Sequence, residues 1–340
     1  MKSRILPLIA TFVVFVLLYL VGFQRFDAFG TTKVLSNVLT DKAFLGITAV
    51  GMTFVILSGG IDLSVGSVIA FTGVFCATLI ENSGWHPLVV FGLSLVIGAC
   101  FGAAMGAVIY YFKIPPFIVT LSGQFLARGM AFVITTASVP VTHPFYNELG
   151  NLFIRFPDKG KLSFVAMLFL VVLLLGIVLA HFTRFGRNVY AIGGNDTAAL
   201  LLGVPIRNTT IGIYMLSSLL ATLGGIAYSL YTDSGYPLAA TGVEMDAIAA
   251  VVIGGTLLTG GVGYVAGTFI GILIQGIIQT YITFDGTLNS WWAKIAIGFL
   301  LLLFIALQKF LTAGGVVWVR SLFRRFMPGT AKQPVPASGG

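Results

Sequence analysis

The sequence predicts an all-α polytopic membrane protein with about ten transmembrane helices and both termini in the cytoplasm. Hydrophobic residues make up 57% of the 340 residues and charged residues only 9%, whereas a soluble domain carries roughly a quarter charged residues. The mean hydropathy is +1.01. The 42 glycines agree with this class, because small residues allow membrane helices to approach one another closely.

Ten apolar segments follow from the roughly 20 residues that a helix needs to cross the hydrocarbon core. The first is too long for the apolar region of a signal peptide and lacks a small-x-small cleavage site, so we expect a retained span. An even number of spans puts both termini on one side. The predicted segments are 5–23, 43–58, 61–80, 88–112, 117–135, 164–182, 210–231, 246–259, 264–283 and 291–310.

The basic residues predict which side is cytoplasmic. With both termini inside, eleven of the nineteen Lys and Arg residues fall on the inner side and six on the outer side, and Asp62 and Asp196 are the inner acids. Cytoplasmic loops of membrane proteins carry such an excess of Lys and Arg. Orientation therefore explains the net charge of +8, and we expect membrane lipid and no nucleic acid as a partner.

Short connections join the segments, so we expect one transmembrane domain over residues 1–326. The tail at 327–340 has low complexity and is predicted to be disordered in the cytoplasm. The longest outer loop, 136–163, is expected to carry a short surface helix over the outer mouth.

A polar stretch at 183–208 falls on the cytoplasmic side. Inside it, Asn195 or Asp196 can cap the start of a helix of about two turns, which Gly203 and Pro205 end.

This helix is too short to be stable alone. Ala198, Leu201 and Leu202 lie on one face at i, i+3 and i+4 spacing. We therefore expect the helix to dock into a groove of another protein.

The chain also lacks a phosphate-binding loop that ends in Gly-Lys-Ser or Gly-Lys-Thr. Its only Gly-Lys pair, Gly160-Lys161, is followed by Leu162. If ATP drives this protein, another polypeptide must hydrolyse it.

Residues 49–67 resemble residues 250–268 at a constant offset of 201, which indicates an internal repeat. Each copy contains an apolar segment, a Gly-Gly turn and a second apolar segment, and our topology gives both the same direction. Corresponding glycine-interrupted pairs indicate a transport pathway, although Gly-Gly turns between membrane helices also recur by chance.

Two groups of polar residues lie within the predicted spans, one at the start of a span and one deep inside another. Asp62 and Ser64 follow the first Gly-Gly turn, where either can cap the next helix or line a cytoplasmic gate. Arg128 lies deep in its segment, and Gln124 shares its face one turn earlier. They can line the pathway, or Arg128 can bind neighbouring carbonyl groups.

Each of four further residues has two alternative roles. Gln275 and Gln279 form a polar stripe that suits sugar hydroxyls, or hydrogen bonds between helices. Glu244 and Asp246 precede the eighth segment on the outer side. They are helix N-caps favoured by the helix dipole, or docking points for a basic patch on an external protein.

No catalytic constellation, metal site or cofactor is expected. His86, His143 and His181 are far apart in the sequence without metal-ligand spacing. Cys76 and Cys100 lie inside apolar segments and are expected to act as small hydrophobic residues.

Five motifs carry a resemblance to a known family. SGGIDLSVGS (58–67), IPPFIVTL (114–121), TRFGRNVYAIGGN (183–195) and DAIAAVVIGGTLLTGGVG (246–263) resemble the permease subunits of ribose-type bacterial ABC sugar importers. QTYITFDGTLNSWWAKIAIG (279–298) is similar to one of the two permeases of galactofuranose importers. The resemblance covers about residues 5–310.

The resemblance implies an inner-membrane permease that pairs with a second permease, two ABC ATPase domains and a periplasmic sugar-binding protein. It also implies that the short cytoplasmic helix couples the permease to the ATPase. Thr197 stands where the wider importer motif has Glu, so the contact made by that Glu is not carried over. The expected coupling residues are Arg187, Asn195, Asp196, Thr197, Ala198, Ala199 and Gly203.

We therefore expect a permease for a monosaccharide, with galactofuranose as the first candidate and no enzymatic activity of its own. A permease for ribose or branched-chain amino acids is one alternative. A stand-alone secondary transporter is another, although the spans contain almost none of the paired acids that ion coupling requires.

Overall fold

The computed structural model describes residues 2–158, 160–289 and 291–312. In this part of the chain, seven helices are long and apolar enough to cross a membrane. The number rises to eight if the bent pair Thr32–Asp41 and Ala43–Leu57 forms one span. The chain is an all-α polytopic membrane protein. The count of ten spans and the side of the termini stay predictions, and the tail at 327–340 lies outside the described residues.

Each of the ten predicted segments contains a helix. These helices are α1 (Lys2–Arg25), α3 (Ala43–Leu57), α4 (Val65–Glu81), α5 (Pro87–Phe112), α6 (Pro116–Ile134), α8 (Phe164–Phe182), α11 (Ile206–Thr232), α12 (Val243–Ile253), α13 (Val265–Asp285) and α14 (Trp291–Thr312). The connections between them contain η1 (Asp27–Gly30), α2 (Thr32–Asp41), β1 (Val139–Pro140), α7 (Pro144–Gly150), β2 (Phe153–Arg155), β3 (Lys161–Ser163), α9 (Arg184–Gly194), α10 (Asp196–Leu201) and β4 (Ser234–Gly235).

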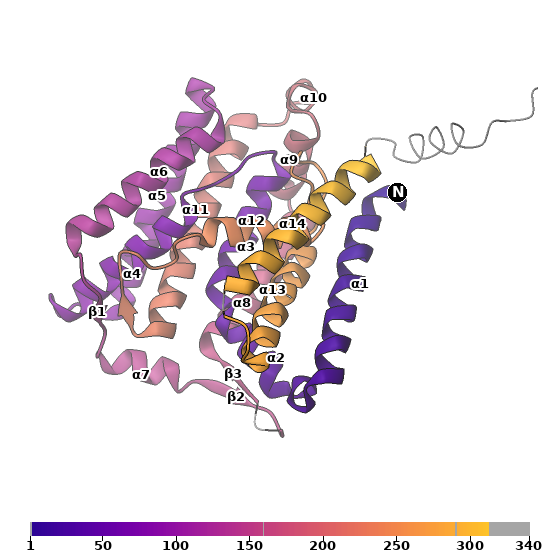
Figure 1. The fold of residues 1–340 in the computed structure, drawn as a ribbon. Helices are drawn as coiled ribbons and strands as arrows, with labels where there is room; N and C mark the ends of the chain where they lie inside the picture. The colour runs from indigo at the N-terminus through magenta and orange to yellow at the C-terminus, as the bar shows by residue number, and fades with distance from the viewer. Residues whose placement is uncertain (1, 159, 290, 313–340) are drawn as a thin grey trace, which may run out of the picture.

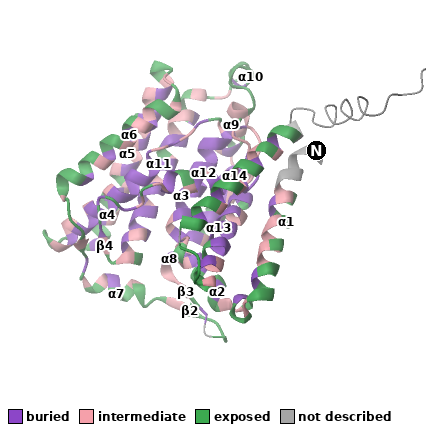
Figure 2. Ribbon diagram, in the orientation of Figure 1, coloured by how far each residue is buried: buried purple, intermediate pink, exposed green. Residues whose placement is uncertain are grey.

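Helix α3 forms the centre of the bundle. All of its residues except Phe44 are buried, and α8, α11, α12 and α13 pack around it. A helix that is hydrophobic on every face is expected to be buried in this way. Gly51 lets α11 approach closely, because a Cβ there would lie 3.1 Å from the Cα of Ser217. Figure 2 shows the buried residues gathered in these central helices, with much exposed surface on α1, α5, α6 and α14.

Several predicted boundaries differ from the helix ends, by up to six residues, and two of these differences have a clear cause. Helix α4 begins at Val65 and not at residue 61, because the chain around Asp62 is held outside the helix by side-chain hydrogen bonds. Helix α12 ends at Ile253 and not at residue 259. There, Gly255 adopts a φ of +90°, and the Thr256 amide donates to the Val251 carbonyl at 3.2 Å. This is a left-handed C-terminal cap, which ends a helix.

The bundle has two distinct ends (Figure 1). The start of α1, the end of α14 and the α9–α10 connection lie at one end, which we call the α10 end. Helices α2 and α7 and the β2–β3 pair lie at the other, which we call the α7 end. The surface helix expected within 136–163 is confirmed as α7.

Asp158, in the β2–β3 loop, fixes the start of α2. Its carboxylate accepts hydrogen bonds from the Thr32 hydroxyl and from the Thr32 amide, the latter at 2.7 Å. These bonds, the hydroxyl first, hold the pKa of Asp158 below its usual value of 3.8. A lowered pKa stabilises the folded loop above pH 3.8, and the effect is lost as the pH falls through the folded-state pKa.

We expect Asp158→Asn to speed hydrogen exchange of the Thr32 amide at neutral pH and to have no effect once Asp158 is protonated in the native protein. Exchange followed from pH 7 to values well below pH 3.8 checks this, since the difference between the two proteins must disappear as native Asp158 becomes protonated. A difference that stays the same down to the lowest pH at which the protein remains folded would contradict the assignment.

Candidate functional site

Helix α10 has the start and the end that its sequence predicts. The Asn195 side chain accepts a hydrogen bond from the Ala198 amide at 2.8 Å, which satisfies one of the free N–H groups of the first turn. At the other end Gly203 adopts a φ of +78°. The Gly203 amide donates to the Leu200 carbonyl and the Val204 amide to the Ala199 carbonyl, each at 3.0 Å. This pair of bonds is the Schellman motif, which favours glycine at the left-handed position.

The outer face of α10 is apolar and uncovered. Leu200, Leu201 and Leu202 are 63%, 84% and 83% exposed. Ala198 is exposed as well, whereas Ala199 faces the protein and is buried. Three neighbouring exposed leucines on one short helix indicate a contact surface for another molecule.

Helix α9 connects α10 to the bundle, and the sequence alone did not predict it. The Thr183 hydroxyl accepts a hydrogen bond from the Gly186 amide at 3.2 Å and caps the helix. Arg187, predicted to contact the ATPase, is exposed on α9. Arg207 was expected in the same loop but lies in the first turn of α11, with its guanidinium 5.6 Å from the ring centre of Tyr111.

The C-terminal end of α9 packs directly against both Gly-Gly turns of the internal repeat. A Cβ on Gly193 would overlap the Leu57 carbonyl oxygen and lie 2.6 Å from the Gly261 nitrogen. The Gly261 amide itself donates to the Leu57 carbonyl at 2.8 Å. One glycine of α9 therefore contacts the turn after α3 and the turn before α13 at once.

The two turns have similar geometry. Gly59 and Gly260, equivalent at the offset of 201, adopt φ values of +83° and +82°. Because the turns contact each other, both hairpins reverse at the same end of the bundle, as the parallel orientation requires. The copies differ in that α12 ends before its turn, whereas α3 runs directly into its own.

Tyr190 adds a second contact between α9 and the later turn. Its hydroxyl donates to the Gly263 carbonyl at 2.7 Å. Burial, with a smaller contribution from Tyr264, raises the pKa of Tyr190 to about 12, so the hydroxyl keeps its proton and remains a donor. A cleft of about 410 Å³ lies beside this junction, between the first turn, the end of α5 and the α9–α10 connection.

Asp62 lies behind the first turn in a closed hydrogen-bond network. Its Oδ1 accepts from the Ser64 amide at 2.9 Å and the Ser64 hydroxyl at 2.6 Å, and its Oδ2 accepts from the Ser217 hydroxyl at 2.8 Å. All three side chains are fully buried. The predicted capping was wrong in detail: neither Asp62 nor Ser64 bonds the free amides of the first turn of α4. Asp62 instead ties the turn to α11.

Glu244, Gln124 and Arg128 meet between α6, α4 and α12. The Gln124 amide donates to Glu244 Oε1 at 3.3 Å, and Gly66 leaves the space that Oε2 occupies. Within the described residues, Oε2 has no hydrogen-bond partner although it is buried. Arg128 donates to the Ala239 and Pro237 carbonyls, which agrees with the alternative that it binds neighbouring carbonyl groups.

Asp246, Gln275 and Gln279 belong to a second polar cluster, which α12, α13, α14 and Lys42 form together. Gln275 donates to the Asp246 carbonyl at 2.9 Å, which is the hydrogen bond between helices that we considered. Asp246 pairs with Lys294 on α14, and Gln279 accepts a hydrogen bond from Lys42.

Glu244 and Asp246 lie in the first turns of α12, but the N-cap is Gly242, so the predicted N-cap roles were wrong. Docking to an external protein stays a prediction for both. Glu244 offers little surface for it, because it is only 7% exposed.

Comparisons with known proteins agree with a transport site. Residues 34–305 match the model of the family described as "Branched-chain amino acid transport system / permease component". The chain belongs to this permease family. It is 60% identical over 318 residues to the inner membrane ABC transporter permease protein YjfF of Escherichia coli K12, which covers 94% of this chain and 95% of the relative. This chain is therefore a multi-pass permease of the inner membrane and not an enzyme.

Two further relatives carry substrate names. The fructose import permease protein FruG of Bifidobacterium longum is 39% identical over 323 residues, covering 93% of this chain and 94% of FruG. The ribose import permease protein RbsC of Escherichia coli K12 is 39% identical over 283 residues, covering 83% of this chain and 87% of RbsC. No solved structure matches this chain.

Three contributors to the site were missed in the sequence: Gly193, Ser217 and Lys42. Gly193-Gly194 is one of seven Gly-Gly pairs in the sequence, so the pair alone did not single out this position. Ser217 stands in an ordinary apolar helix, and only the packing of α11 on α3 brings it to Asp62. Lys42 had been counted only as a basic loop residue.

Proposed function

We propose that this permease is the membrane subunit of an ATP-driven importer of a monosaccharide, and that galactofuranose is the first substrate to test. The names of FruG and RbsC support a sugar, and the motif at 279–298 supports galactofuranose. The single observation that carries the proposal is the α9–α10 unit. Exposed leucines form one side of this unit, and on the other side Gly193 packs directly against the two Gly-Gly turns.

The unit suggests how ATP hydrolysis acts on the bundle. An ABC ATPase binds the exposed face of α10, with Asn195, Asp196 and Thr197 near the contact. When the ATPase domains close, α10 moves and α9 moves with it. Because Gly193 contacts both turns without intervening side chains, the displacement reaches the ends of α3 and α13 directly. Asp62, bound to the first turn and to α11, extends the motion to α11 and acts in the gate.

The two ends of the bundle also suggest where the other partners bind. A second permease subunit completes the path across the membrane. A periplasmic sugar-binding protein docks at the α7 end, on the loops at 136–163 and 233–246, and releases sugar into the path. Gln124, Arg128 and Glu244 lie below that mouth.

The experiment that tests this function is uptake by a reconstituted complex of the two permeases, the ATPase and the binding protein. Labelled galactose, part of which takes the galactofuranose form in water, is offered first, and ribose, fructose and leucine follow in turn, with ATP inside the vesicles. We expect uptake of a monosaccharide and none of leucine. Because the family description names branched-chain amino acids, leucine uptake without sugar uptake would overturn the proposal. Uptake by this chain alone would favour a secondary transporter.

Gly203→Val is expected to abolish sugar-stimulated ATP hydrolysis while the chain still inserts into the membrane. Nothing lies within 4 Å of a Cβ at this position, so the effect comes from the φ of +78°. A left-handed conformation costs a residue with a Cβ about 1–2 kcal/mol, which is enough to unwind the last turn of α10. Gly203→Asn is the matched control, since Asn tolerates this region. Equal loss of activity in both variants would contradict a role for the turn.

A further inference from the structure

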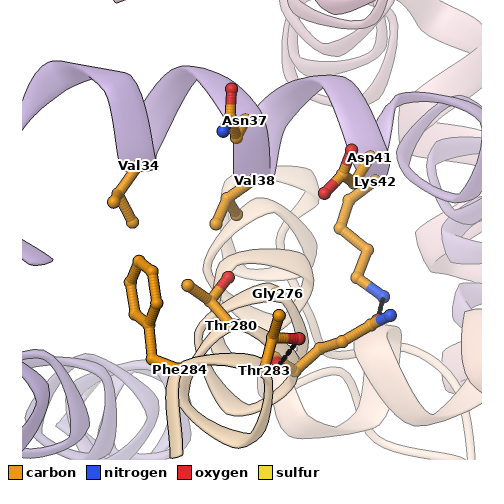
Figure 3. A pocket seen from close by; sticks show the side chains of 10 residues that line it. Val34, Asn37, Val38, Asp41, Lys42, Gly276, Thr280, Thr283 and Phe284 are labelled. Carbon is orange, nitrogen blue, oxygen red and sulfur yellow. Dashed lines mark hydrogen bonds between the residues drawn. The ribbon is translucent and has the colours of Figure 1, made fainter. Parts of the chain in front are cut away.

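A small recess opens between α2 and α13 near the α7 end, away from the α9–α10 unit (Figure 3). Its volume is about 170 Å³, which corresponds to roughly six water molecules at about 30 Å³ each. Asn37, Asp41 and Lys42 line one side, and Gln279 and Thr280 line the other. The recess can therefore hold one small polar molecule.

A break in the helix at Lys42 creates the polar side of this recess. Helices α2 and α3 meet there at an angle of 61°, and Lys42 separates Asp41 from the start of α3. Helix breaks at membrane depth are tolerated where they line a cavity or a substrate site. The break places a carboxylate and an ammonium group beside the α13 amide.

Several polar groups in the recess have unused hydrogen-bonding capacity. Lys42 donates to Gln279 Oε1, which leaves the Gln279 amide hydrogens free to donate. Within the described part of the chain, the Asn37 amide and the Thr280 hydroxyl make no hydrogen bond. Asp41 Oδ1 accepts from the Tyr231 hydroxyl at 2.9 Å, and its second oxygen can still accept. The free groups are mostly neutral amides and hydroxyls, which pair with hydroxyl groups.

Apolar side chains from the same two helices complete the lining. Val34 and Val38 come from α2 and Phe284 from α13, and the Phe284 ring centre lies 5.5 Å from the Phe26 ring centre. A monosaccharide has the same division, with hydroxyl groups around its edge and C–H groups on its faces. Because Asp41 and Lys42 balance each other, the recess favours a neutral ligand over an anion or a cation.

We propose that this recess is an outer subsite that binds a monosaccharide through Asp41, Gln279 and Thr280, with Asn37 at its rim, before the sugar enters the central path. This assignment rests on the proposed import of a sugar. It adds a binding position on the permease itself, formed by the helix break.

Thiol labelling of the assembled complex tests the subsite. Asn37→Cys is introduced together with Cys100→Ser, since Cys76 is buried and Cys100 exposed. A membrane-impermeant thiol reagent is applied to spheroplasts with ribose, fructose or galactose present in turn. Ser83→Cys, on the exposed loop after α4, is the matched control. We expect the transported monosaccharide to slow labelling at position 37 at least fivefold and to leave position 83 unchanged.

A second variant separates binding from folding. Thr280→Val keeps the side-chain shape and is expected to reduce protection of position 37 and subsaturating sugar uptake about fivefold, the effect of losing one hydrogen bond, while the amount of assembled complex in the membrane stays the same. Transport of a sugar by the unmodified complex without protection of position 37 would overturn the subsite and leave the proposed function standing. Protection by leucine, or by lipid regardless of sugar, would also overturn it. Absence of all sugar uptake would instead overturn the proposed function, and the subsite with it.

Discussion

Gly193→Ala is expected to reduce sugar-stimulated ATP hydrolysis and uptake at least tenfold. The added methyl group would overlap the Leu57 carbonyl oxygen and lie 2.6 Å from the Gly261 nitrogen. Both neighbours are backbone atoms, so α9 must move away from the two turns. Overpacking of this kind costs about 1–3 kcal/mol. The displacement of α9 also separates α10 from the helices that α10 moves in the proposed mechanism.

Gly194→Ala is the matched control. It makes the same chemical change one residue later, where nothing lies within 4 Å of a Cβ. Neither glycine adopts a positive φ, so both substitutions change helix propensity alike. We expect Gly194→Ala to keep near-normal coupling. Similar activity in the two variants would mean that the contact of Gly193 with the turns does not carry the coupling.

Asp62→Ala is expected to give the largest loss of stability, about 3 kcal/mol, together with loss of uptake. The substitution removes the acceptor of three hydrogen bonds and leaves the Ser64 and Ser217 hydroxyls buried without it. An unsatisfied buried polar group costs about 1–3 kcal/mol, and more when the missing partner was charged. Thermal denaturation of the purified complex measures the stability, and vesicle uptake measures the function.

Two milder substitutions distinguish a structural role of Asp62 from a role in the gate. Ser217→Ala removes one donor and is expected to cost about 1 kcal/mol, with uptake reduced less than in Asp62→Ala. Asp62→Asn keeps the shape and removes the charge. If Asp62→Asn restores stability but not uptake, the carboxylate acts in the gate. Full uptake in Asp62→Ala would show that the network serves neither purpose.

The positions of the helices were largely predictable because the signal was strong. Ten apolar runs predicted ten helices, since a polytopic chain in lipid has few alternatives to helix. The end of α12 was missed because glycine controls the backbone there. The apolar run 246–259 continues past Ile253, and only the positive φ of Gly255 shows that the helix has ended.

The candidate site was predictable where its contacts are local. A cap at Asn195 or Asp196 and a glycine end at position 203 follow from spacing alone, and the structure has the cap at Asn195 and a positive φ at Gly203. Contacts between distant segments were not predictable. Gly193 meets Leu57 and Gly261, and Lys42 meets Gln279 across 237 positions, so these pairs emerge only from how the helices pack.

The central claim is that α10 is the surface that receives the ATPase, and a photo-crosslink tests it most directly. A photoreactive amino acid replaces Leu201, which is 84% exposed on α10, or Val96, which is 60% exposed on the long apolar helix α5. The assembled complex is irradiated and its products are separated by mass. We predict a permease–ATPase adduct from position 201 and none from position 96. A complex that still imports sugar but gives no ATPase adduct from position 201 would contradict it.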